Sequence, residues 1–299
     1  MKKRVLKKSV KNKLILIGIS IILLIILINT IKYYRSDIHK LKKMGYSKAT
    51  AKEIVSINKV SDVLNNKYSN NILDILKSKY YISKNLARYI DYINNNNTTI
   101  DNAVTLVNTL RDKDFYTDGY YTNTNDGYAM LVNKYYKLDS EYQPENLVKV
   151  KNWYAYGEQL LDSEAYDAYI KLFNAAKEEG YTLIINEAYR SYEDQEKIHK
   201  RLKDDTAAKA GYSEHQTGLA IDITYPKYDD DMHSKEYNWL SENAYKFGYI
   251  LRYPENKENI TGYTFEPWHY RYVGVDLATK VYNSRLTFDE YYAYYIENK

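Results

Sequence analysis

Apolar and polar positions divide the chain into regions of different periodicity. Residues 14–31 form an 18-residue run that is mostly leucine and isoleucine and carries no charge. Residues 37–117 are polar, and their apolar residues recur at helical spacing, which predicts short helices. Residues 118–299 combine short apolar runs, typical of strands, with longer amphipathic stretches, typical of helices. These patterns predict one hydrophobic helix, a helical region and a folded domain.

Within the domain, local signals place individual elements. Asp162 or Ser163 is expected to cap a helix that Gly180 ends, and Ser191 with Asp194 forms a capping-box-like start for the next helix. Because strands and helices do not alternate in a regular βαβ order, we expect an α+β fold with an antiparallel sheet flanked by helices. Strands are predicted at 128–132, 181–189, 218–224, 249–253 and 269–273, and helices at 163–179, 191–202, 236–247 and, as a closing pair, 276–297.

The apolar run at 14–31 is expected to anchor the chain in a membrane as a single span. Its length is near the lower limit of the roughly 17–25 residues that cross a bilayer. The preceding residues 1–13 carry seven basic side chains, which predicts a cytoplasmic N-terminus and an extracytoplasmic remainder. A cleaved signal peptide is the alternative, but the run is long for one and 29–33 offers no small-x-small cleavage site. No cysteine follows the run, so lipid anchoring is excluded.

The polar region at 37–117 contains a short internal similarity. The pattern of residues 47–54 recurs 36 residues later in residues 83–90, which suggests two copies of one helical hairpin. We interpret the region as a solvated stalk between membrane and domain, because no cluster of aromatic residues or like charges marks a binding surface. A small module that binds the cell wall or a partner is the alternative. Residues 94–97 and 112–124 are expected to be linkers.

Composition limits the chemistry that the domain can carry. The chain of 299 residues has a net charge of +4 and no cysteine, which excludes a thiolate zinc site, a cysteine nucleophile and a disulfide framework. Histidine and carboxylate ligands are then the only route to a metal. Asp222 interrupts the buried strand 218–224, on the face opposite Leu219 and Ile221, and therefore needs a cation, a donor or water. His215, just before this strand, is the obvious companion.

A third metal ligand is expected at His269, which opens a later aromatic-rich strand. Three protein ligands and one water are the pattern of a catalytic zinc site. Glu266 stands three residues earlier, and Pro267 rules out a helical turn that enters here, so Glu266 and His269 should share a sharp bend. His39, His199 and His233 have no comparable setting, and we interpret them as solvated.

These residues carry a resemblance to a known family. The motifs Ser213-x-His215-x-x-Gly218-x-Ala220-x-Asp222 and Glu266-x-Trp268-His269 resemble those of the zinc D-alanyl-D-alanine carboxypeptidases of the VanY type, and the resemblance runs from about residue 128 to the C-terminus. It extends to residues 187–195, which look like the family's arginine segment, and to residues 131–134, which are similar to its usual domain opening. One departure is Ala210, before Gly211, where the family has proline; this changes the stiffness of a loop and no ligand.

The resemblance implies a mechanism. One zinc ion per chain, held by His215, Asp222 and His269, would polarise the scissile carbonyl and activate water. Glu266 would act as general base and then as proton donor to the leaving amine. Arg190 would stabilise the developing oxyanion or hold the substrate's terminal carboxylate. Further hydrogen bonds to substrate are expected from Ser213 and Gln195.

The substrate that the resemblance implies is the peptidoglycan stem peptide, from which a bacterial enzyme of the cell membrane would remove the terminal D-alanine. An extracytoplasmic domain at 118–299 would meet this substrate. A related endopeptidase or a D,D-dipeptidase on the same zinc site remains an alternative, as does a wall-binding module without turnover. We expect the membrane as a partner through the N-terminal helix and no nucleic acid, and the oligomeric state stays open.

Overall fold

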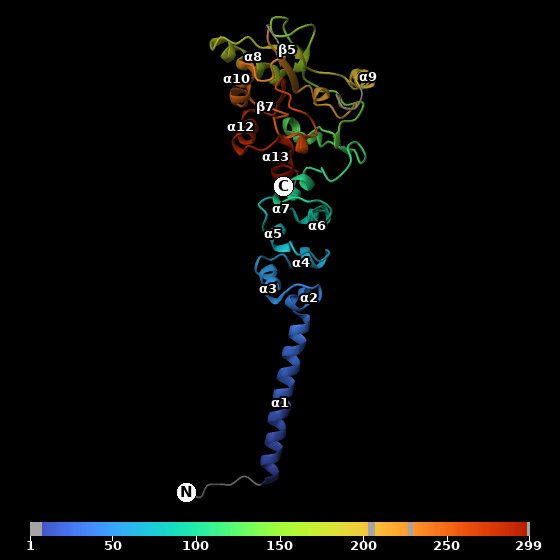
Figure 1. The fold of residues 1–299 in the computed structure, drawn as a ribbon, viewed down its shortest axis with the longest axis vertical. Coiled ribbons are helices and arrows are strands. Elements are labelled where there is room, and N and C mark those ends of the chain that lie inside the picture. Colours follow the sequence, from blue (N-terminus) through green and yellow to red (C-terminus); the bar gives the residue numbers. More distant parts are fainter. Residues whose placement is uncertain (1–7, 203–206, 227–229, 298–299) are drawn as a thin grey trace. The chain divides into compact units, whose positions relative to one another are not determined.

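The computed structural model describes residues 8–202, 207–226 and 230–297. The chain forms two compact units, Met1–Val104 and Thr105–Lys299. The first begins with the 28-residue helix α1 (Lys8–Arg35; Figure 1). Within α1, the segment Ile15–Tyr33 is the only stretch of the described chain that is long and apolar enough to cross a membrane, and its side chains are exposed. By length and composition, it fits a membrane span or a signal sequence.

The rest of the first unit is helical, as the periodicity predicts. Leu41, Ile54, Ile75 and Tyr89 are fully buried and belong to its small core. The internal similarity is reproduced in part: Ser47 caps α3 by accepting a hydrogen bond from Thr50 N, whereas the equivalent position lies in a 3-10 turn before α6. The helices are α2 (Asp37–Lys43), α3 (Lys48–Ser56), α4 (Val60–Leu64), α5 (Ile72–Lys77) and α6 (Leu86–Asn95), and α7 (Ile100–Asn108) begins in this unit and ends in the second.

The second unit is built on a four-stranded antiparallel sheet, which confirms the α+β prediction. Its strand order is β5-β6-β8-β7. The ladder sets Asp222 of β6 opposite His269 of β8. The sequence therefore predicted the antiparallel class of the sheet and all four of its strands, although the strands are shorter than expected. They are β5 (Ile184–Glu187), β6 (Ala220–Thr224), β7 (Tyr249–Leu251) and β8 (His269–Tyr272).

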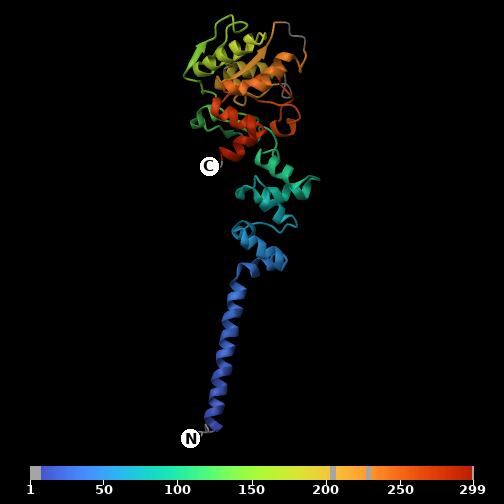
Figure 2. The ribbon, with the colours of Figure 1, turned by 90° about the vertical axis from the view of Figure 1, so that its left-hand side faces the viewer.

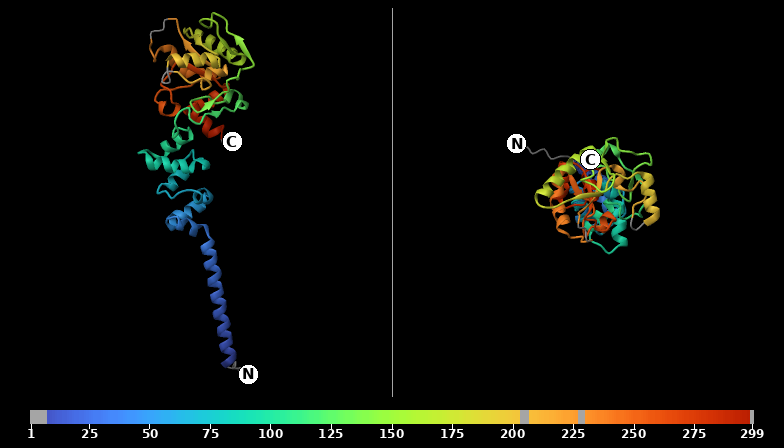
Figure 3. Two further views of the ribbon diagram at one scale, coloured as in Figure 1. Left: turned by 90° about the vertical axis from the view of Figure 1, so that its right-hand side faces the viewer. Right: turned by 90° about the horizontal axis from the view of Figure 1, so that it is seen from above.

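Helices surround this sheet (Figures 2 and 3). One face packs on α8 and α10, where Ile221 and Ile223 share a core with Tyr169 and Leu240. Asp222 lies on the opposite face, as strand alternation predicts. Ile250 and Val273 pack in a second core on α12 and α13. The helices of this unit are α8 (Ser163–Glu178), α9 (Tyr192–Leu202), α10 (Lys235–Asn243), α11 (Glu258–Thr261), α12 (Val275–Ser284) and α13 (Phe288–Tyr295).

The predicted helix boundaries are confirmed at three positions that have a capping residue or a glycine. Asp162 caps α8 by accepting hydrogen bonds from the backbone N–H groups of Glu164 and Ala165 at 3.0 and 3.2 Å. Gly180 follows α8 at φ +90°, a left-handed conformation that glycine adopts without strain. Ser191 accepts from Asp194 N at 3.1 Å and starts α9.

The strand predicted at 128–132 is wrong. Residues 124–129 form 3-10 turns instead, because Asn123 caps them through Asn125 N and Gly127 turns the chain at φ +57°. Two small sheets were not predicted, and one of them contains Tyr120–Tyr121 from the expected linker at 112–124. These sheets pair β1 (Tyr120–Tyr121) with β2 (Tyr136–Lys137) and β3 (Leu147–Lys149) with β4 (Leu160–Asp162).

Candidate metal centre

The three predicted metal ligands meet on one face of the sheet. His215 lies in a 3-10 turn (Glu214–Thr217) just before β6, Asp222 lies within β6, and His269 is the first residue of β8. One potential ligand atom from each residue lies within 4.8 Å of the other two. His215 Nε2 is 3.5 Å from Asp222 Oδ2, and His269 Nδ1 is 2.9 Å from Asp222 Oδ1. The strand register, rather than sequence proximity, brings them together.

The donor set fits zinc. His215 Nδ1 is 2.6 Å from the carbonyl oxygen of Ala188, which can only accept, so Nδ1 carries a proton and, in the neutral ring, Nε2 presents its lone pair to the site. Two imidazole nitrogens and one carboxylate match the ligand types and number of a catalytic zinc site that keeps one position open. A carbonyl partner on the far nitrogen is also the usual way in which a metal-binding histidine is oriented.

Gly218 sets the path of the chain between the two ligands of the first motif. It follows the 3-10 turn at φ +69° and ends it in a left-handed conformation. A Cβ atom at this position would lie 2.8 Å from a methyl carbon of Leu147, closer than carbon atoms pack, and 3.1 Å from Pro144, which is a tight contact. Glycine is therefore required here by both backbone angle and space.

Glu266 lies in the bend that the sequence predicts. The backbone N–H of His269 donates to the carbonyl oxygen of Glu266 at 3.1 Å, which closes a turn rather than a helix. The Glu266 side chain shares a pocket of about 220 Å³ with all three metal candidates. Burial raises the pKa of Glu266 to about 7, so this carboxyl group can both accept and donate a proton near neutral pH.

The electrostatic balance of the pocket favours a cation. Burial alone would raise the pKa of Asp222, but the adjacent imidazoles of His215 and His269 outweigh it, and the pKa lies well below its ordinary value. Burial alone would lower the pKa of His269, yet the neighbouring carboxylates of Asp222 and Glu214 raise it to about 9. Carboxylates thus surround His269, and this arrangement stabilises positive charge at the site.

The structure brings the predicted arginine into the same pocket. Arg190 follows β5 and donates from Nη1 to Gln195 Oε1 and from Nη2 to Glu187 Oε2, each at 2.8 Å. Gln195 also donates to the carbonyl oxygen of Ala208 at 2.7 Å, so its amide orients Arg190 and the adjacent loop. Ser213 is buried and lines the pocket beside His215.

None of the remaining three histidines is a member of the cluster of described metal candidates. His233 is exposed, as predicted, and stacks on Phe265. The expectation of solvation was wrong for His39 and His199, which are half-buried: His39 packs edge-on against Tyr33, and His199 Nδ1 is 3.0 Å from the carbonyl oxygen of Ala207.

A buried ion network next to the metal centre was not predicted. Glu214 is 1% exposed, and its Oε1 accepts hydrogen bonds from Arg252 and Arg271, both fully buried. Burial alone would raise the pKa of Glu214, but the two guanidinium groups hold it well below its usual range. The signal was present in the sequence, because an arginine within each of two apolar strands requires an acidic partner.

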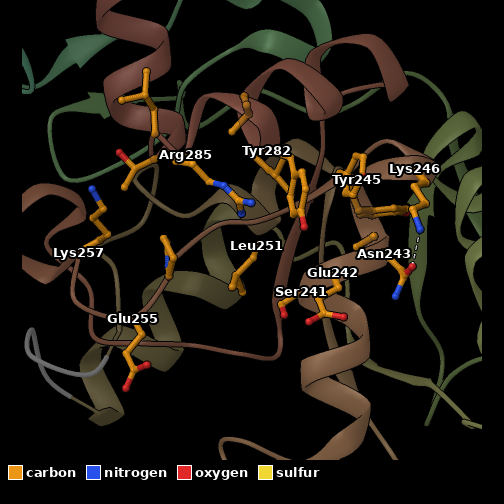
Figure 4. Close-up of a pocket in the computed structure, with 17 residues that line it drawn as sticks. Ser241, Glu242, Asn243, Tyr245, Lys246, Leu251, Glu255, Lys257, Tyr282 and Arg285 are labelled. Carbon is orange, nitrogen blue, oxygen red and sulfur yellow. Dashed lines mark hydrogen bonds between the residues drawn. The ribbon is translucent and has the colours of Figure 1, made fainter.

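A larger cavity of about 630 Å³ lies elsewhere in the unit. Figure 4 shows it with Leu251 of β7 and with Tyr282 and Arg285 at the end of α12. Tyr282 stacks on Tyr245 with ring centroids 3.9 Å apart. Of the described residues that line this cavity, none is a metal candidate.

Comparisons with known proteins address the same region. The family model for VanY, D-alanyl-D-alanine carboxypeptidase, matches residues 158–275, which include every predicted site residue. A Bacillus subtilis protein named as the carboxypeptidase YodJ is 39% identical over 193 residues, covering 58% of this chain and 71% of that protein. The chain belongs to the VanY family of D-alanyl-D-alanine carboxypeptidases. The resemblance predicted from the two motifs is thereby confirmed.

Two further VanY-family comparisons differ in the bond that their names specify. An Enterococcus faecium D-alanyl-D-alanine carboxypeptidase is 31% identical over 228 residues, covering 73% of each chain. The solved structure of the LD-carboxypeptidase LdcB is 38% identical with a TM-score of 0.55, and the match covers 60% of this chain and 94% of that one. Similarity to these proteins is therefore compatible with cleavage of either a D,D or an L,D peptide bond.

Proposed function

We propose that this chain is a zinc-dependent carboxypeptidase that removes the terminal D-alanine from peptidoglycan stem peptides on the outer side of a membrane. The observation that carries the proposal is one pocket in which His215, Asp222 and His269 converge with Glu266 and Arg190. A metal donor set, a carboxyl group with a raised pKa and a guanidinium are groups that a metallopeptidase uses to hydrolyse a C-terminal peptide bond.

The proposed metal would be held by His215 Nε2, His269 Nδ1 and a carboxylate oxygen of Asp222. When bound, zinc supplies a Lewis acid for the scissile carbonyl and lowers the pKa of water. Asp222 can serve both imidazoles because it projects from the central strand β6 between them. His215 is held by Ala188, so its ring keeps one orientation.

Glu266 would move the protons. Its pKa of about 7 allows it to take a proton from the attacking water and then to give it to the leaving amine. The bend at Pro267 places this carboxyl group in the pocket, and Glu266 N donates to the carbonyl oxygen of Tyr253 at 3.1 Å, which ties the bend to the segment after β7. A carboxyl group fixed in this way is available for both proton transfers.

Arg190 would bind the carboxylate that defines a carboxypeptidase substrate. Its guanidinium is 15% exposed and is oriented by Glu187 and Gln195, while its buried Nε has no hydrogen-bond partner within the described chain. A planar guanidinium suits bidentate binding of a carboxylate. Ser213, buried next to His215, would donate a further hydrogen bond to the substrate.

An L,D-carboxypeptidase is the second candidate, because LdcB shares 38% identity and a TM-score of 0.55 with this chain. An endopeptidase or a D,D-dipeptidase would use the same pocket with a different substrate length. The donor set is common to these reactions, so the walls of the pocket, including Tyr253, Tyr263 and Trp268, must select among them.

The experiment that tests the proposal compares substrates. The full chain in detergent, loaded with zinc, is incubated with stem pentapeptide, stem tetrapeptide, a cross-linked dimer and free D-Ala-D-Ala, and the products are identified by mass. Loss of one alanine from the pentapeptide alone supports the proposal. Preferential cleavage of the tetrapeptide would identify an L,D-carboxypeptidase, cleavage of the dimer an endopeptidase, and cleavage of the free dipeptide a D,D-dipeptidase.

A further inference from the structure

Glu214 is buried at the junction of the metal centre and the interior of the second unit. Its Oε1 accepts from Arg252 Nε at 2.8 Å and from Arg271 Nη1 at 3.1 Å, and all three side chains are inaccessible to solvent. Both arginines lie in or next to the sheet that carries the site: Arg271 lies in β8, and Arg252 directly follows β7. One carboxylate oxygen of Glu214 therefore accepts hydrogen bonds from two buried guanidinium groups.

The second carboxylate oxygen points toward a metal candidate. Glu214 Oε2 is 3.5 Å from His269 Nε2, and among the residues that the structure describes neither of these buried atoms has a hydrogen-bond partner. The second nitrogen of the ring, Nδ1, faces Asp222 at 2.9 Å. The imidazole of His269 thus lies between two carboxylates, one on each nitrogen.

We propose that Glu214 is a positioning residue that keeps His269 in the tautomer able to bind metal. A neutral imidazole carries one proton, so Nδ1 presents a lone pair to a metal only when the proton is on Nε2. Glu214 Oε2 is the acceptor that this Nε2–H group would find, and a carboxylate in this position is known to orient metal-binding histidines. The inference rests on the proposed function only in that a metal occupies the site.

The surroundings of Glu214 hold its carboxylate in place. Arg252 is fixed by Asp289 of α13, with Nη1 to Oδ2 at 2.6 Å and Nη2 to Oδ1 at 3.3 Å. Arg271 donates from Nη2 to the carbonyl oxygens of Tyr128 and Met130 at 3.1 and 2.9 Å. Because both guanidinium groups are anchored, the Glu214 carboxylate cannot rotate away from His269 without leaving a buried cation unpaired.

A purely structural role for Glu214 makes a different prediction. If this carboxylate only neutralised the arginines, then removing its charge should resemble removing the charge of Asp289, which pairs with Arg252 and lies 75 positions later in the chain. Asp289 contacts Arg252 and Asn133 and is not paired with His269. Asp289→Asn is therefore the matched control: it perturbs the same buried network without touching a metal candidate.

The first test measures metal affinity in the full chain, by competition between the protein and a chelator for zinc and for cobalt(II). Glu214→Gln should bind either ion about 10–100-fold more weakly and change the cobalt absorption spectrum, because its amide no longer offers a carboxylate to His269. Asp289→Asn should bind near wild type even where it lowers the unfolding temperature. Equal metal affinity in Glu214→Gln and wild type, or equal losses in the two variants, would overturn the proposal.

The second test needs no variant of the network to fold. In the unmodified full chain with ¹⁵N-labelled histidines, imidazole nitrogen shifts identify the tautomer of each of the five rings, and His269→Ala assigns the signal in question. The proton of His269 is expected on Nε2 in the zinc-loaded protein. A proton on Nδ1 would contradict the proposal. Failure of the peptide assay with this tautomer present would count against the proposed function alone.

Discussion

Asp222 is the residue on which both imidazoles of the metal centre converge. It projects from β6 on the face opposite the apolar core and pairs in register with His269. A partly buried carboxylate in a central strand is costly unless charges or donors compensate it. The compensation here comes from His215 and His269, and in the proposed state from a metal. The contacts that Asp222 makes with the two imidazoles and the proposed metal, rather than fold stability, explain why this position is acidic.

Glu266→Gln is expected to separate catalysis from metal binding. The amide keeps the shape of the side chain but cannot accept the proton, so peptide hydrolysis should fall toward the upper end of about 10²–10⁴-fold while metal content stays near wild type. Metal analysis and a hydrolysis assay on the same preparation check this. Unchanged hydrolysis would exclude Glu266 as the base, and lost metal would make it a ligand.

His215→Ala and Asp222→Ala are each expected to lose bound metal and hydrolysis together. Each change removes one of three proposed ligands, and the remaining two hold zinc weakly. His199→Ala and His233→Ala are the controls and should retain both properties, because neither residue lines the pocket of the metal candidates. An empty site in the His233 variant would show that the ligand set is incomplete.

At the scale of elements, the residues that mark helix ends were predicted correctly, whereas the buried partners of Glu214 were not. Asp162, Gly180 and Ser191 mark helix ends because each acts on backbone groups a few residues away. Glu214 was missed because its partners lie 38 and 57 positions away. The 3-10 turns that include residues 124–129 were also missed, because they depend on the left-handed conformation of Gly127 and not on a periodic pattern of apolar residues.

Gly218→Ala is expected to destabilise the second unit and weaken metal binding. The left-handed backbone costs any other residue about 1–2 kcal/mol, and contact with Leu147 should add roughly 1–3 kcal/mol by overpacking. Gly157→Ala is the matched control, with φ +67° and no atom near the added methyl group. Denaturant unfolding and chelator competition compare the two. Equal effects of both substitutions would show that the contact with Leu147 is unimportant.

For the whole molecule, α1 and the basic residues before it predict on which side of the membrane each end of the chain lies. The seven basic residues before the apolar run should keep the N-terminus in the cytoplasm, so residues from Lys40 onward should be digested by protease added to intact cells. Replacing those basic residues by glutamate should invert part of the population or impair insertion. A cytoplasmic marker must stay intact in the same cells. Complete protection of the unaltered chain would contradict an extracytoplasmic catalytic unit.

We propose that peptide cleavage depends on the metal site formed by His215, Asp222 and His269. Removal and return of the metal test it most directly, with release of alanine from stem pentapeptide by the full chain measured by mass. Cleavage is expected to stop when a chelator removes the metal and to return when zinc is added to the dialysed protein. Cleavage that continues in the metal-free protein, or no cleavage by a folded, zinc-loaded chain, would contradict it.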